Sequence, residues 1–110
     1  MTALSADQDV VGRLLVRLAE GVAEGVDCPV GDVWCSFVPA SAQCIGERLG
    51  SPCPIVVIRG RARAGERVVA GMAAAARVVA AELRVPVEDV WVQWLDVLPG
   101  RAFAGGAVID

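Results

Sequence analysis

The sequence predicts an α/β (α+β) protein built from two β-α-β repeats, whose four strands form one mixed sheet with both helices on the same face. The main observation is an internal repeat: residues 27–34 and 84–91 share Pro, Val, Asp, Val and Trp without a gap, at an offset of 57 (86 − 29 = 91 − 34 = 57). A helical pattern precedes each copy, so one supersecondary unit is used twice. Two strands joined by a helix of this length normally lie parallel, with a right-handed crossover.

The first repeat is expected to contain a helix over about residues 7–25. Ser5 and Gln8 have the spacing of a capping box, which marks the start of a helix. Apolar residues then recur at three- and four-residue spacing and form one stripe: Val10, Val11, Leu14, Leu15, Leu18 and Val22. Residues 33–38 are rich in β-forming side chains and follow the helix-breaking Pro29, so they predict a strand.

The remaining elements complete the two repeats. Residues 40–52 hold scattered Gly, Ser and Pro and predict a loop with at most a short helical turn. Residues 55–58 are apolar on both faces, which indicates a central strand covered by helices on one side and by more protein on the other. An alanine-rich helix is expected over residues 65–83, followed by a strand over residues 90–95.

Length and hydropathy indicate one domain that associates with copies of itself. A chain of 110 residues fits a single domain, here made of two pseudo-repeats at about 1–46 and 53–106. Apolar residues make up 55% of the chain and the mean hydropathy is +0.57. Uncharged runs are nevertheless far shorter than the roughly 20 residues that cross a bilayer, so we expect no membrane span. The surplus apolar surface predicts subunit interfaces, as in a closed ring of three chains.

Charge and composition exclude several classes of function. The net charge of −3 leaves no basic footprint for nucleic acid. All ten basic residues are arginines, and the chain has no Lys and no His, which excludes a Schiff-base lysine, a histidine base and a histidine-ligated metal. A general base would therefore be a carboxylate, a thiolate or the terminal amine, and we expect no cofactor and no metal.

The four cysteines predict a cytoplasmic protein. They are Cys28, Cys35, Cys44 and Cys53, and their spacing matches neither a zinc site nor the CxxC of a redox site. No signal-peptide pattern precedes Leu4. We interpret them as reduced, mostly buried thiols.

Several segments resemble a known family. Residues 54–61, 86–92 and 99–106, in this order around a helix, resemble one complete subunit of 4-oxalocrotonate tautomerase. Upstream, residues 32–39 and 44–46 resemble the layout of macrophage migration inhibitory factor, which fuses two such units. The resemblance implies a trimeric tautomerase-like fold, with a short terminal hairpin that reaches a neighbouring subunit. It also implies cofactor-independent keto–enol proton transfer on small α-keto or enol carboxylates.

The catalytic base is not identified by the sequence. In the family the base is an amino-terminal proline, whereas this sequence begins Met1-Thr2. Three explanations stay open: the true start lies upstream, the activity has been lost, or another residue is the base. The alternative functions are a non-catalytic trimeric binding or assembly module, and a subunit that borrows a proline from a different chain in a mixed oligomer.

Four residues match positions that line the substrate pocket in the family: Arg61, Trp91, Gln93 and Phe103. Arg61 would hold a substrate carboxylate, or else it is a solvated charge at a strand end. Trp91 and Gln93 share one face of their strand because side chains alternate, and this face lines either a pocket or a subunit interface. Phe103 would form an aromatic wall, or else it is a packing residue.

Overall fold

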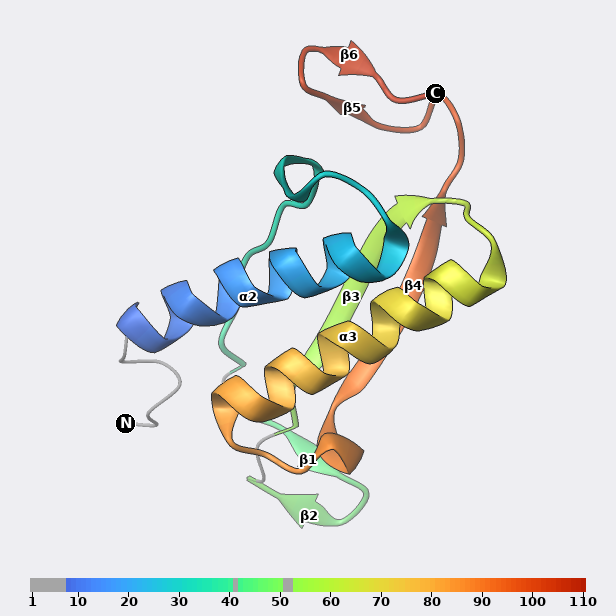
Figure 1. Ribbon diagram of the computed structural model, residues 1–110. Helices are drawn as coiled ribbons and strands as arrows, with labels where there is room; N and C mark the ends of the chain where they lie inside the picture. Colours follow the sequence, from blue (N-terminus) through green and yellow to red (C-terminus); the bar gives the residue numbers. More distant parts are fainter. Residues whose placement is uncertain (1–7, 41, 51–52) are drawn as a thin grey trace.

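Two helices lie side by side on one face of a parallel pair of strands (Figure 1). The computed structural model describes residues 8–40, 42–50 and 53–110. The helices are α2 (Gln8–Val26) and α3 (Gly65–Leu83), and the strands are β3 (Ile55–Arg61) and β4 (Trp91–Val97). The helix predicted at 65–83 is thus confirmed to the residue, and both apolar strands of the second repeat extend beyond their predicted ends.

The helices and the turns after them recur at the offset of 57. Helix α2 becomes α3 when 57 is added to each bound, and the 3₁₀ turn η1 (Val30–Asp32) likewise becomes η2 (Val87–Asp89). The residues that leave the helices, Asp27 and Arg84, both have positive φ values, of 62° and 56°. Each therefore takes the left-handed conformation that reverses the chain towards the next strand.

Small residues allow the two helices to approach closely. A Cβ atom built on Gly25 would lie 2.8 Å from the backbone of Ala70, and one built on Gly71 would lie 2.7 Å from the side chain of Val26. Contacts this short exclude any larger side chain. The Gly and Ala residues of the helical stripes therefore set the distance between the helices.

The core lies between the helices and one face of the sheet. Its centre is formed by Val22, Val26 and Ala75, of which Ala75 is fully buried. Side chains of the strands and of the segments after α2 pack around this centre: Cys28, Val33, Val56, Ile58, Val92 and Trp94. Burial alternates along β3, with every second residue exposed. The opposite face of the sheet is thus not covered by the described residues.

Strands β3 and β4 are parallel, with Ile55 opposite Trp91 and Arg61 opposite Val97. The backbone N–H of Trp91 donates to the carbonyl oxygen of Pro54 at 2.9 Å, which extends the pairing by one residue at the start of the strands. The described residues contain sheets of two strands each, of which this parallel pair is the longest.

The strand prediction for residues 33–38 is wrong for the described part of the chain. These residues alternate between half-buried and exposed positions but form no strand. In the second repeat, the pairing partner of β4 is β3. Among the described residues, no segment pairs with residues 33–38. A strand needs such a neighbour for its ladder hydrogen bonds. Ser5, the proposed cap of the first helix, also lies outside the described residues.

The loop predicted at 40–52 contains a hairpin instead. Strand β1 (Cys44–Ile45) pairs antiparallel with β2 (Arg48–Leu49). Gly46 lies in the turn between the two strands with a φ of 58°, and Gly50 follows β2 with a φ of 83°. Glycine adopts such positive φ values without the strain that a Cβ would cause.

The hairpin expected near the end of the chain is present. It consists of β5 (Phe103–Ala104) and β6 (Ala107–Val108), joined by Gly105 and Gly106 at φ values of 62° and 84°. Two consecutive positive φ values belong to the type I′ turns that fit two-residue hairpins. The hairpin projects beyond the end of β4 (Figure 1).

Candidate functional site

The predicted site residues on the strands lie on the uncovered face of the sheet. On this face the register places Ile55 opposite Trp91 and Val57 opposite Gln93 at the beginning of the strands, and Arg59 opposite Leu95 towards their ends. Ile55 is 64% exposed, Trp91 63% and Val57 42%. This sheet face, which comprises Ile55, Val57, Arg59 and Arg61 of β3 with Trp91, Gln93 and Leu95 of β4, is called the open face below.

The side chains of Trp91 and Gln93 are hydrogen-bonded to each other at the amino-terminal end of the open face. The indole Nε1–H of Trp91 donates to Oε1 of Gln93 at 3.4 Å, which leaves the amide N–H₂ of Gln93 directed elsewhere. Both side chains are exposed. The pair offers a flat aromatic surface beside an amide donor, a combination that suits a planar conjugated ligand.

Arg61 lies at the other end of β3. Its side chain is exposed, and it forms no ion pair with any described residue. Its carbonyl oxygen accepts a hydrogen bond from Nη1 of Arg63 at 3.4 Å. The guanidinium group of Arg63 in turn lies 5.9 Å from the ring centroid of Trp94, within cation–π range. The guanidinium of Arg61 is therefore available to an external carboxylate.

The structure does not bring Arg61 and Trp91 together within one protomer. Because Arg61 is opposite Val97, it is six positions from Trp91 along the strand pair. At about 3.3 Å per residue this amounts to about 20 Å. Phe103 lies in the terminal hairpin, at the end of the sheet where Arg61 is found (Figure 1), and is 71% exposed. A ligand that contacts all four predicted residues would have to contact more than one chain.

One groove lies away from the open face. It has a volume of about 510 Å³ and runs between α3 and β4 on the helix side of the sheet, where Arg63, Met72, Trp94 and Asp96 contribute to its wall. Nε1 of Trp94 donates to Oδ1 of Asp96 at 2.8 Å, so the polar groups of this wall already bond each other. None of the four predicted site residues lines it.

Burial raises the pKa of the Cys35 thiol above its ordinary value of 9.0. Pro54 begins the strand pair, but its nitrogen belongs to a peptide bond and cannot accept a proton as an amine does. In residues 8–40, 42–50 and 53–110 no cluster of three acidic, cysteine or histidine side chains could hold a metal ion. Among the helices described there, none is long and apolar enough to cross a membrane.

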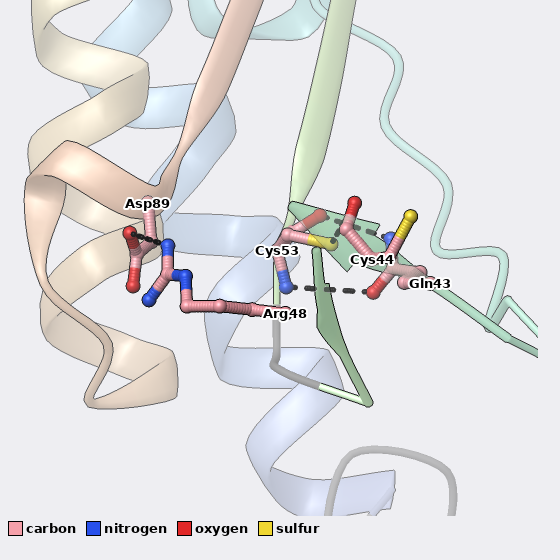
Figure 2. Close-up of polar contacts among 5 residues, drawn as sticks. All are labelled: Gln43, Cys44, Arg48, Cys53 and Asp89. Carbon is pink, nitrogen blue, oxygen red and sulfur yellow. Dashed lines mark hydrogen bonds and ion pairs between the residues drawn. The ribbon is translucent and has the colours of Figure 1, made fainter. Parts of the chain in front are cut away.

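Sequence reasoning missed one polar cluster, shown in Figure 2. The Gln43 amide binds both backbone groups of Cys53, and Nη2 of Arg48 lies 3.1 Å from Oδ1 of Asp89. The second contact fixes the β1–β2 hairpin to the turn before β4. No local pattern reveals such contacts, since they join residues ten and 41 positions apart.

Comparison with known proteins identifies the fold. A scan against protein-family models gives no match, and neither does a search of curated proteins. Solved structures do match, over most of the chain. A fused 4-OT described as a wild-type symmetric trimer has a TM-score of 0.78 and 18% identity, covering 94% of this chain and 86% of the other.

Two further solved structures represent other branches of the same fold. N1, a member of the cis-3-chloroacrylic acid dehalogenase family, has a TM-score of 0.81 and 18% identity, with 99% and 78% of the two chains covered. The macrophage migration inhibitory factor of Toxoplasma gondii has a TM-score of 0.76 and 18% identity, with 96% and 92% covered. The chain therefore has the fold of the tautomerase superfamily, which confirms the predicted fold class.

Proposed function

We propose that this chain is a tautomerase-superfamily protein that binds small α-keto or enol carboxylates and moves a proton between their oxygen and carbon atoms without a cofactor. The observation that carries the proposal is the match of nearly the whole chain to this fold, together with the exposed Arg61, whose guanidinium forms no ion pair with a described residue. Charge-assisted, bidentate contacts make arginine well suited to hold a carboxylate.

We further propose that the functional unit is a homotrimer in which the two repeats, about 1–46 and 53–106, form a single domain. The open face supports this assembly, because a monomer would leave Ile55, Val57 and Trp91 in water. A fused 4-OT of the same fold is a trimer. Assembly would also resolve the separation of about 20 Å between Arg61 and Trp91, since each pocket would combine Arg61 of one chain with Trp91 and Gln93 of another.

In this arrangement each predicted residue has a chemical role. Arg61 binds the substrate carboxylate, and the amide of Gln93 donates a hydrogen bond to the oxygen on which negative charge develops. Trp91 and Phe103 enclose the conjugated part of the substrate. A base removes the enol O–H proton, and a proton is delivered to the adjacent carbon. Since the chain has no Lys or His, the base would be a terminal amine, a carboxylate or a thiolate.

A second candidate function is a non-catalytic trimeric module that binds or assembles without proton transfer. Its support is that Pro54, the proline at the head of β3, has an amide nitrogen and no basicity. Both candidates use the same trimer and the same open face.

Ketonisation of phenylpyruvate enol, followed by absorbance, distinguishes the two functions. An active protein accelerates the reaction over buffer, and Arg61→Ala raises KM by about 10- to 100-fold, as expected for loss of a charge-assisted carboxylate contact. Arg77→Ala is the matched control, because Arg77 is an exposed arginine of α3 far from the open face. A rate equal to that of buffer would exclude the enzyme and leave the binding module.

Light scattering during size exclusion tests the trimer. The proposal requires a mass three times that of the 11.4 kDa chain, and a stable monomer would contradict it. We place the protein in the cytoplasm, where its four cysteines, all unbonded in the structure, stay reduced under ordinary conditions.

A further inference from the structure

Two cysteines are brought together where the β1–β2 hairpin meets the start of β3. Sγ of Cys53 lies 3.9 Å from the carbonyl oxygen of Cys44, within the range of a thiol hydrogen bond. In Figure 2 the two residues are neighbours, and the thiol of Cys53 points towards the main chain of Cys44. The two residues are nine positions apart in the sequence.

The approach of the two cysteines is fixed by Gln43. Its Nε2 donates to the carbonyl oxygen of Cys53 at 2.9 Å, and its Oε1 accepts from the backbone N–H of Cys53 at 3.4 Å. The carbonyl oxygen of Gln43 also accepts from the backbone N–H of Gly50 at 2.9 Å. The main chain on both sides of the cysteine pair is thus held by hydrogen bonds. The side chain of Cys44 is exposed and can rotate between staggered rotamers.

The two thiols differ in solvent exposure, which suits a reaction that begins at one thiol and is completed by the other. Cys44 is exposed and meets a soluble oxidant, whereas Cys53 is 8% exposed. The other two cysteines are less suited. Cys28 packs against the core, and burial raises the pKa of the Cys35 thiol, which lowers the fraction of reactive thiolate.

We propose that Cys44 and Cys53 form a site of reversible oxidative modification, at which a peroxide converts the two thiols into an intramolecular disulfide. The Cys44 thiolate attacks one oxygen of the peroxide, the O–O bond breaks, and a sulfenic acid forms. The Cys53 thiol then attacks the Cys44 sulfur, the S–S bond forms, and the S–O bond breaks with loss of water. In total, two thiols and one hydrogen peroxide yield one disulfide and two waters.

The disulfide would lock the hairpin against the sheet. Arg48, in the same hairpin, already lies 3.1 Å from Asp89, which is two residues before Trp91. A covalent bond between residues 44 and 53 would therefore restrain the segment beside the Trp91 end of the open face. The inference rests only on the contacts of these residues and stands whether or not the protein is a tautomerase.

Tryptic peptide mapping of the full-length protein tests the proposal. Trypsin cleaves after Arg17, Arg48 and Arg59, so Cys53 falls in peptide 49–59 and the other three cysteines fall in peptide 18–48. The protein is treated with stoichiometric hydrogen peroxide, free thiols are alkylated, and the digest is analysed by mass spectrometry. We expect peptide 18–48 linked to peptide 49–59, with a mass lower by two hydrogens than the sum of the two, and separation of the pair by dithiothreitol.

Variants identify the partner of Cys53. Cys44→Ser is expected to abolish the linked pair, whereas the double variant Cys28→Ser/Cys35→Ser keeps it. Cys44 is exposed, so its replacement leaves the core intact. The proposal is overturned if peroxide leaves all four thiols free, if the only bond lies within peptide 18–48, or if the oxidised protein runs as a disulfide-linked dimer on a non-reducing gel.

Limited digestion of the native protein gives an independent readout. Arg48 is exposed and lies between the two cysteines. After oxidation, cleavage at Arg48 should leave one band on a non-reducing gel and two on a reducing gel. Two bands under both conditions would show that residues 44 and 53 are not joined.

Discussion

The indole ring of Trp94 lies directly over Gly60 of the neighbouring strand. A Cβ atom on residue 60 would come within 2.7 Å of the ring carbon Cζ2, which no real Cβ contact allows. The same ring is 5.9 Å from the guanidinium of Arg63. Arg63 also donates to the carbonyl of Arg61, so this contact links the packing of the helix side to the end of β3 that carries Arg61.

Gly60→Ala is expected to destabilise the protein by about 1–3 kcal/mol, because the added methyl group overpacks the site against a rigid ring. Urea denaturation measures the change. Gly12→Ala is the matched control: no atom lies within 4 Å of a Cβ there, and replacing an exposed helical Gly by Ala should stabilise by up to about 1 kcal/mol. Equal effects of the two substitutions would contradict the packing described for Trp94.

Arg84→Gly is expected to raise stability by about 1 kcal/mol. Arg84 follows α3 with φ 56° and ψ 47°, a left-handed conformation that costs a residue with a Cβ about 1–2 kcal/mol and glycine almost nothing. Thermal unfolding followed by circular dichroism measures the gain. Arg77→Gly, in the middle of the same helix, should instead lower stability by about 1 kcal/mol. A loss at both positions would show that Arg84 does not have this backbone conformation.

Ile55→Glu is expected to prevent assembly without unfolding the chain. The substitution places a charge on the apolar part of the open face, which the proposed trimer would bury, and desolvation of that charge opposes association. Analytical ultracentrifugation reports the oligomer and circular dichroism the fold. Val16→Glu is a close control, since Val16 on α2 is 61% exposed, against 64% for Ile55. If Val16→Glu dissociates the oligomer and Ile55→Glu does not, the helical face is the interface and the open face is not.

Stability is expected to fall as the pH rises above about 9, in part because of Cys35. Burial raises the pKa of this thiol in the folded protein above its ordinary value of 9.0. The stabilising contribution of the neutral thiol is therefore complete below the unfolded-state pKa and is lost as the pH rises through the folded-state pKa. Urea midpoints between pH 7 and pH 10 measure the slope, with reductant present. Cys35→Ala should flatten it, and an unchanged slope would assign the effect to other groups.

Local patterns predicted the helices accurately because helical hydrogen bonds join residues four positions apart. The apolar stripe predicted a helix over residues 65–83, and these are the observed bounds of α3. The terminal hairpin was expected from the family resemblance, and its turn is formed by Gly105 and Gly106, which take the two positive φ values of a type I′ turn. The repeat at offset 57 predicted that helix α2 and its turn would match α3 and η2.

Features that depend on distant partners could not be predicted in this way. Residues 33–38 have the composition of a strand, but a strand requires a neighbour, and none of the described residues provides one. The β1–β2 hairpin was missed because its few residues have no periodicity. Its position depends on the contact of Arg48 with Asp89, 41 residues later.

The sequence alone determined the fold class, the helices and the two strands of the second repeat. These features depend on periodicity and on turn-forming residues, which can be recognised from residues close together in the chain. Only the tertiary structure decided that Arg61 and Trp91 lie at opposite ends of one sheet face, and that Cys44 and Cys53 lie together. The register of a parallel pair and the docking of a hairpin arise from contacts between segments far apart in the chain. Patterns among neighbouring residues do not show such distances directly.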